Sequence, residues 1–144
     1  MPTCAVETCY DMHITGTVVT GKGEGGSYIS RPGYQEQFRQ RLDMQPFPGT
    51  LNLRLQGDDV ERFANLQEHE GIHIAGFQQG GQTFGAVTCY PCVVNDTVKG
   101  AIVIPQKSVY HDVMEIVADV CLRDTLHLQD GDPVTVTVET SAGD

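Results

Sequence analysis

The sequence predicts a mainly β protein built as a closed or nearly closed barrel, and two observations carry this prediction. Short runs of β-branched and apolar residues recur along the chain, separated by turns rich in glycine, proline or asparagine. Only two or three stretches have the spacing of apolar residues that an amphipathic helix needs. Many short strands with few short helices are typical of small barrels, which remove exposed sheet edges by closing on themselves.

The composition limits the kinds of partner that the protein can have. At 144 residues the chain has the size of one domain with an ordinary hydrophobic core. Its formal net charge is −10 and its isoelectric point is about 4.7. This balance argues against nucleic acid or an anionic membrane as a partner, because both need a basic surface. A nucleotide ligand would need its phosphates neutralised locally, by a metal ion, an arginine or backbone amides.

The sequence predicts neither a signal peptide at the N-terminus nor a membrane span. Residues 1–11 lack the basic and apolar segments of a signal peptide, and no apolar run in the sequence reaches the length of a membrane span. We therefore expect a cytoplasmic, monomeric protein. Residues 1–11 are expected to be a flexible N-terminal tail, and residues 12–140 to form a single domain.

Apolar periodicity gives each element an expected place. The first strand is expected over about 12–20, followed by a glycine-rich loop and a short strand around Tyr28. Helices are expected over 34–42, 58–66 and 121–127. The other expected strands cover 50–55, 71–77, 82–90, 97–104 and 133–139, with a brief apolar stretch at 115–118.

The most unusual stretch is the glycine-rich loop, which holds four glycines within residues 21–26. Glycine lets backbone N–H groups approach a ligand closely, as in phosphate-binding loops. The spacing matches G-x-G-x-x-G, yet Pro32 and Gly33 oppose the helix that a dinucleotide-binding fold needs at this point. A flexible hairpin is the more frequent explanation of such a loop taken alone.

A second candidate site lies on the expected strand over 50–55. Leucine alternates with polar residues there, so Thr50 and Asn52 share the face opposite the core, roughly 6–7 Å apart along the strand. Oxygen atoms at this spacing suit a hard cation such as Mg²⁺, which keeps some waters and takes oxygens from substrate phosphates. An ordinary polar outer face is the more frequent explanation of this spacing alone.

The cysteines and histidines predict no metal centre. Five cysteines, an odd number, do not suggest a disulfide framework. Cys89 and Cys92 are three apart on an expected strand and so face opposite sides, which favours apolar packing over zinc binding or redox chemistry. His69 and His73 are four apart, but this spacing brings side chains together only within a helix.

Six motifs occur in order between about residues 13 and 139, and Pro48-Gly-Thr-Leu-Asn-Leu53 is the most distinctive of them. The other five are Gly21-Lys-Gly-Glu-Gly25, Gly100-Ala-Ile-Val-Ile-Pro105, Glu115-Ile-Val-Ala118, Leu122-Arg123 and Asp130-Gly-Asp132. In order and spacing the set resembles the CTP-dependent riboflavin kinases, a family known chiefly from archaea.

The resemblance implies a small, closed six-stranded cradle-loop barrel over residues 12–140. It also implies transfer of the γ-phosphoryl group of CTP to the 5′-hydroxyl of riboflavin, giving FMN and CDP, with Mg²⁺ as the cofactor. By position it assigns nucleotide binding to Lys22, Gly23, Glu24, Gly25, Gly26, Ser27, Val120, Cys121, Leu122 and Arg123, the metal to Thr50 and Asn52, and flavin binding to Ser108 and Glu115.

Together these features suggest one mechanism. Phosphoryl transfer needs mainly positioning and charge neutralisation. We therefore expect amides of 22–27 to hold the phosphates while Mg²⁺ on Thr50 and Asn52 bridges their oxygens. Arg123 is a candidate for nucleotide recognition, and Glu115 is a candidate general base. Two alternatives remain open: a non-catalytic barrel that binds a nucleotide or flavin, which would not need the metal ligands, and a protein-interaction module.

Overall fold

The computed structural model describes residues 9–20, 31–47, 49–105 and 112–141. Within these ranges the chain forms nine strands and three helices. In chain order they are β1 (Cys9–Val19), α3 (Pro32–Leu42), β2 (Leu51–Arg54), α4 (Asp58–Leu66), β3 (Ile72–Ile74), β4 (Phe77–Gln79), β5 (Gln82–Phe84), β6 (Val87–Val94), β7 (Val98–Pro105), β8 (Val113–Ala118), α5 (Leu122–Thr125) and β9 (Pro133–Ser141). Across them, no helix combines the length and apolar character that crossing a bilayer requires.

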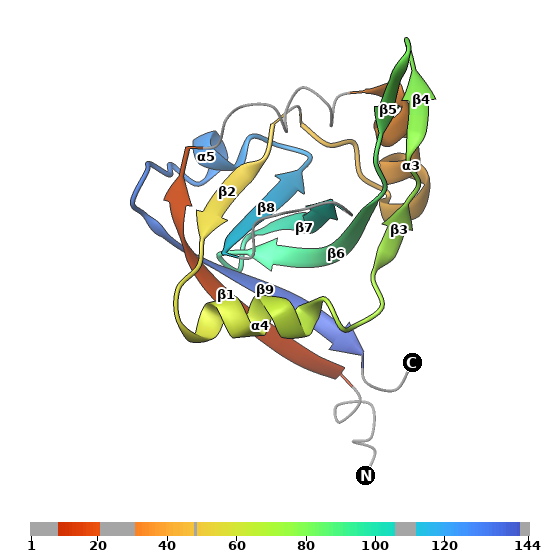
Figure 1. Ribbon diagram of the computed structural model, residues 1–144. Helices are drawn as coiled ribbons and strands as arrows, with labels where there is room; N and C mark the ends of the chain where they lie inside the picture. The colour runs from red at the N-terminus through yellow and green to blue at the C-terminus, as the bar shows by residue number, and fades with distance from the viewer. Residues whose placement is uncertain (1–8, 21–30, 48, 106–111, 142–144) are drawn as a thin grey trace.

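Six strands close into an antiparallel barrel, which confirms the predicted fold class (Figure 1). The order around the barrel is β6, β7, β8, β2, β1 and β9, and β9 pairs with β6 to close the ring. This closing contact uses only residues 92–94 of β6, because the first half of the strand pairs with β3 instead. The longest pairing joins β1 to β9 along nearly the whole of both strands.

Two clusters of buried apolar side chains lie on opposite faces of the barrel wall. Alternate residues of the six barrel strands fill the interior, together with Phe63 and Leu66 of α4. The second cluster covers the outer face of β6, β7 and β8, where α3 contributes Tyr34 and Phe38. Each fully buried side chain of this size stabilises the fold by about 1.5–3 kcal/mol relative to exposure. Apolar packing on both faces of the wall therefore contributes to stability.

Helix α3 begins at Pro32, two residues before its expected start. Proline suits this position, because in the first turn it loses only an N–H that has no partner within a helix. The prediction that Pro32 and Gly33 oppose a helix begun at the glycine-rich loop concerns residues outside the described ones and stays a prediction. The helix ends at Leu42, as expected. Asp43 follows in the left-handed conformation with φ of 51°, and its N–H bonds back to the carbonyl of Phe38.

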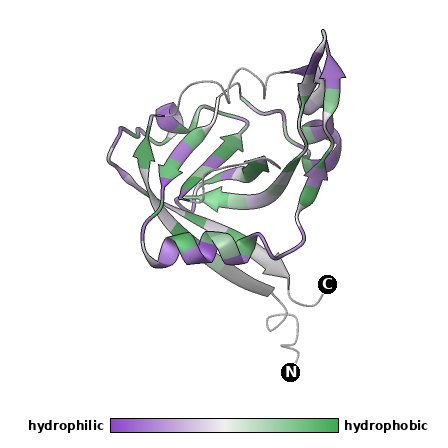
Figure 2. Cartoon of the chain, viewed as in Figure 1, coloured by the Kyte–Doolittle hydropathy of each residue, from purple (hydrophilic) through white to green (hydrophobic). Residues whose placement is uncertain are grey.

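Helix α4 has the bounds that the sequence predicts, Asp58–Leu66. Hydrophilic and hydrophobic residues are interspersed along it (Figure 2). Phe63 and Leu66 are buried, and its other residues are exposed or half-buried. Asp59 accepts a hydrogen bond from the backbone N–H of Thr15 at 3.0 Å, which attaches the helix to β1.

The hairpin expected within 71–90 forms in two parts. At its tip, β4 and β5 are joined by Gly80 and Gly81, whose φ values of 59° and 79° suit glycine in a tight turn. Figure 2 shows this tip as hydrophilic. At its base the rings of Phe77 and Phe84 stack with centroids 5.0 Å apart. Below them, β3 pairs with the beginning of β6.

Two element boundaries differ from expectation. β1 begins at Cys9 instead of residue 12, because its pairing with β9 continues that far. α5 covers only Leu122–Thr125, because His127 adopts a left-handed φ of 55°. The rest of the expected tail and the expected strand around Tyr28 lie outside the described residues.

The cysteines of β6 pack as small apolar side chains, as predicted. Cys89 belongs to the outer cluster and Cys92 to the interior, so the two thiols face opposite sides of the wall. Burial raises the pKa of each thiol to about 12, so neither forms a reactive thiolate at neutral pH. In the described part of the chain, no three His, Cys, Asp or Glu side chains are grouped in a way that could hold a metal.

Candidate active site

One row of residues crosses four neighbouring strands of the barrel. Val19 of β1 lies opposite Asn52 of β2, and Asn52 lies opposite Glu115 of β8. The row continues to Val103 of β7. Residues directly opposite in antiparallel strands point to the same face. Here it is the outer face, because the neighbouring Leu53 fills the interior. Strands lie about 4.8 Å apart, so the row brings Asn52 and Glu115 side by side.

A hydrogen bond joins two of the residues that the sequence singles out. Thr50 donates from Oγ1 to Oε1 of Glu115 at 3.1 Å. Thr50, Asn52 and Glu115 are all half-buried. The fold thus gathers a hydroxyl, an amide and a carboxylate on one patch of the outer wall, which we call the polar patch.

Burial changes the acidity of the carboxyl group in this patch. It raises the pKa of Glu115 above its ordinary value, and the hydrogen bond from Thr50 offsets part of the increase. Among the residues that the structure describes, no lysine or arginine forms an ion pair with it. A desolvated carboxylate of this kind accepts a proton more readily than an exposed one, which is what a general base requires.

The polar patch also has the chemistry of a site for a divalent cation. Its oxygens are of the kind that hard cations prefer. Only the oxygens of Glu115 carry charge, and the described residues offer no cluster of acidic, histidine or cysteine side chains that would hold a metal alone. Such a donor set fits an ion that completes its shell with water and substrate phosphate, as Mg²⁺ does.

A second carboxylate, that of Asp130, ties α5 to the end of β1. Arg123 Nη2 donates to Asp130 Oδ1 at 2.5 Å, and Thr20 Oγ1 donates to Asp130 Oδ2 at 2.6 Å. Arg123 Nη2 also donates to the carbonyl oxygen of Val19 at 3.4 Å. We call these contacts the Asp130 clamp. Thr20 directly precedes the glycine-rich stretch, so the clamp joins the strand that leads into it to the segment 120–123, and Figure 1 shows α5 beside this end of β1.

The turn that carries Asp130 is itself held against β1. Gly131 has a φ of 96°, and its N–H donates to the carbonyl of Val18. The carbonyl of Asp132 accepts the N–H of Val18 in return. Asp132 Oδ2 accepts the N–H of Gln129 at 2.8 Å and closes the turn. Contacts of Gly131 and Asp132 therefore hold this turn in place without the side chain of Asp130.

The chain before β2 lies against the end of β8. The N–H of Phe47 donates to the carbonyl of Ala118 at 2.7 Å, and the N–H of Gln45 donates to Oδ1 of Asp119 at 2.9 Å. Phe47 and Val120 are the large hydrophobic residues that are exposed among those described, at 41% and 40%. Both are on segments that adjoin the polar patch.

The remaining predicted site residues are distributed as follows. Cys121 is half-exposed and caps α5, whereas the side chain of Leu122 is buried in the barrel interior and leaves only its backbone for a ligand. The other seven lie outside the described residues and are Lys22, Gly23, Glu24, Gly25, Gly26, Ser27 and Ser108.

The sequence assigned no role to Thr20 or Asp130. A glycine between two aspartates indicates a tight turn, which is a signal for the turn at 130–132 but not for its partners. Residues 20 and 130 are far apart in the chain, and only the pairing of β1 with its neighbours brings them together.

Comparison with known proteins identifies similar sequences. A family model named CTP-dep_RFKase, described as "Domain of unknown function DUF120", matches residues 18–138. A riboflavin kinase of Methanococcoides burtonii is 43% identical over 129 residues, which are 89% of this chain and 57% of the relative. A riboflavin kinase of Archaeoglobus fulgidus is 44% identical over 126 residues, 87% of this chain and 54% of the relative. The chain spans about half the length of the curated relatives that it matches.

Proposed function

We propose a riboflavin kinase activity for this chain, which belongs to the CTP-dependent riboflavin kinase family. In the proposed reaction the 5′-hydroxyl oxygen of riboflavin bonds to the γ-phosphorus of CTP. The bond from that phosphorus to the β–γ bridging oxygen breaks, and FMN and CDP result. The observation that supports this most directly is the polar patch, where Thr50 and Asn52 stand beside Glu115 on one face.

Glu115 is the residue that we propose as the proton acceptor. As the riboflavin hydroxyl attacks, its proton passes to the carboxylate, whose raised pKa suits that role. The hydrogen bond from Thr50 keeps one oxygen of the carboxylate in place and leaves the other for the substrate. Phosphoryl transfer requires little covalent chemistry from the protein, so holding the reactants in line is the larger part of the task.

Charge neutralisation is assigned to the residues around this carboxylate. Thr50 and Asn52 would hold Mg²⁺, which when bound neutralises charge on the phosphates. Arg123 would contact the nucleotide through the donors of its guanidinium. The net charge of −10 repels a polyphosphate, so the phosphates must be neutralised locally, and these groups would provide that neutralisation.

The exposed apolar pair beside the polar patch fits ligands with planar rings. Phe47 and Val120 flank the end of β8 and expose about two fifths of their surface. Both proposed substrates carry a ring system, the flavin in one and cytosine in the other. An aromatic and an aliphatic side chain can contact either through dispersion and the hydrophobic effect.

The test is the production of FMN by the purified protein. Riboflavin and Mg²⁺ are supplied with CTP, ATP, GTP or UTP in separate reactions, and FMN is measured by chromatography. FMN is expected with CTP in preference to the others. Asn52→Ala is expected to raise the Mg²⁺ requirement by about 10–100-fold, as loss of a group at a metal site typically does. Arg54→Ala is the matched control, since Arg54 is exposed on the same face of β2.

Three results would contradict the proposal in different ways. FMN formed equally with every nucleotide would reject the preference for CTP. An unchanged Mg²⁺ requirement in Asn52→Ala would reject the metal site. Absence of FMN with all four nucleotides, from folded protein that still binds riboflavin or CDP, would favour the non-catalytic binding barrel.

A further inference from the structure

We propose that Asp130 is a positioning residue for the nucleotide: it holds the guanidinium of Arg123 in a fixed orientation at the entry to the glycine-rich stretch. This inference rests on the proposed function and goes beyond it, because Asp130 is given no contact with substrate. It acts through Arg123 and through Thr20, the two side chains that donate to its carboxylate.

The guanidinium of Arg123 is held at one of its nitrogen atoms. Its Nη2 atom makes both contacts, to Asp130 Oδ1 and to the carbonyl of Val19. Among the described residues, Nε and Nη1 donate to no partner. A guanidinium has five N–H donors in a rigid plane. When one corner is fixed, the remaining donors keep a constant direction, which lowers the entropy lost when they bind a phosphate or a base.

Folding alone does not explain why a carboxylate is present at this position. The side chains of Arg123 and Asp130 are 37% and 56% exposed, and ion pairs with this exposure add little stability. The turn is already held by Gly131 and Asp132. A negative charge near a polyphosphate is unfavourable in itself, so its presence is better explained by the orientation that it gives to a cation.

Thr20 extends the clamp to the strand that precedes the glycine-rich stretch. Its hydroxyl donates to the carboxylate oxygen that Arg123 leaves free. The backbone of Val18 forms two hydrogen bonds with the turn of Asp130. The end of β1, the start of α5 and this turn therefore form one connected unit, so a change at Asp130 reaches Arg123 and the last residues described before the glycine-rich stretch.

The first experiment compares Asp130→Asn with Asp124→Asn. Asparagine keeps an acceptor for Thr20 but loses the charge that holds Arg123. Asp124 is exposed on α5 next to Arg123, so its variant removes the same charge near the same site. Asp130→Asn is expected to weaken CDP binding, measured by calorimetry, roughly tenfold. The KM for CTP should rise by a similar factor, with kcat and the KM for riboflavin within about twofold. Asp124→Asn is expected to bind CDP no more weakly than the wild type.

A double-mutant cycle tests whether Asp130 acts through Arg123. In an Arg123→Met background, Asp130→Asn is expected to change CDP affinity by less than about twofold, because the group that it positions is gone. The same tenfold loss in both backgrounds would overturn the proposal, as would unchanged or tighter CDP binding by Asp130→Asn alone. Thr20→Val provides an independent variant if Asp130→Asn does not fold, and it is expected to weaken CDP binding by a smaller factor.

Measurements on the wild-type protein distinguish failure of the role proposed for Asp130 from failure of the proposed function. Wild-type protein that makes FMN and binds CDP, with no effect of Asp130→Asn, would reject the role of Asp130 and leave the proposed function in place. Wild-type protein that neither binds CDP nor makes FMN would reject the proposed function, and this inference with it.

Discussion

Two carboxylates of this protein each accept a hydrogen bond from a threonine, and their acidities change in opposite directions. Glu115 accepts from Thr50 at 3.1 Å on the barrel wall, and Asp130 accepts from Thr20 at 2.6 Å on an exposed turn. Burial raises the pKa of Glu115. The hydrogen bonds from Thr20 and then Arg123 lower the pKa of Asp130.

The difference shows that burial outweighs the threonine hydrogen bond at Glu115, whereas at the exposed Asp130 the hydrogen bonds from Thr20 and Arg123 prevail. Glu115 is desolvated by the strands on both sides and has no cation among the described residues to compensate. Asp130 remains in solvent and has both a hydroxyl and a guanidinium. The first arrangement suits proton transfer, and the second suits a permanent anion that orients a cation.

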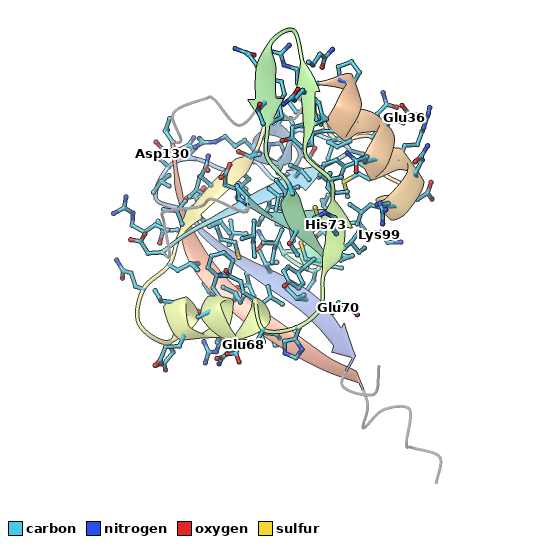
Figure 3. The ribbon with its side chains drawn as sticks, turned by 45° about the vertical axis from the view of Figure 1, so that its right-hand side comes forward. Glu36, Glu68, Glu70, His73, Lys99 and Asp130 are labelled. Atoms are coloured by element: carbon cyan, nitrogen blue, oxygen red, sulfur yellow. The ribbon has the colours of Figure 1, made fainter. Side chains whose placement is uncertain are left out.

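The largest effect expected from this contrast is on catalysis. Glu115→Gln removes the proposed proton acceptor and should lower kcat by about 10²–10⁴-fold, while CDP affinity changes little. Glu68→Gln is the matched control, because Glu68 is exposed and follows the end of α4, at the lower part of the view in Figure 3 and outside the strands that carry the polar patch. FMN production in steady state is the measurement. A loss in kcat of less than tenfold would show that Glu115 is not the base.

A smaller effect is expected on the pH dependence of the reaction. The hydrogen bond from Thr50 lowers the pKa of Glu115, so Thr50→Val should raise that pKa further. A base must be ionised to act, and the acidic limb of the kcat profile should therefore move to higher pH. Thr20→Val makes the same change at the other carboxylate and should leave this limb where it is. Equal displacement in both variants would contradict the separate roles of the two groups.

The smallest expected effect is on stability. The pH dependence that each carboxylate gives to the free energy of unfolding should be opposite in sign. Because folding raises the pKa of Glu115 from its ordinary 4.5, its contribution is fully present below that pH and is lost as pH rises through the folded value. Glu115→Gln should thus gain stability relative to the wild type as pH increases. Urea denaturation over a series of pH values measures this trend, and a relative loss of stability with increasing pH would contradict it.

Asp130 provides the opposite case in the same series. Its folded pKa lies below the ordinary 3.8, so its contribution is present above that pH and is lost as pH falls through the folded value. The group is exposed, so Asp130→Asn should show a weaker and opposite trend, confined to acidic pH. A trend of the same sign in both variants would mean that the two environments do not differ as described.

Much of the fold could be predicted from local sequence pattern. The alternation of leucine with polar residues over 50–55 gave the correct faces of β2, and the bounds of α4 matched at both ends. Both depend on periodicity within one element. The start of α3 at Pro32 was missed because proline both opposes a helix interior and favours a first turn, and its local sequence does not distinguish the two.

For the candidate site, the sequence predicted the residues but not their proximity. The residues of the polar patch were identified as separate candidates, Thr50 and Asn52 from their shared face and Glu115 from resemblance to a family. Their proximity could not be known from periodicity, because the patch needs β8 to pair with β2 at the register that sets Asn52 opposite Glu115. A register one residue different would turn the Glu115 side chain to the other face of the wall.

The sequence by itself determined the fold class, the faces of the strands and the chemistry available to the site, because these follow from residue type and local periodicity. Only the tertiary structure decided which carboxylate is desolvated and which is ionised in solvent. Those properties depend on neighbours far away in the chain, such as Thr20 for Asp130 and the flanking strands for Glu115. Hydrogen bonds and desolvation act over a few ångströms in space, whatever the separation in sequence.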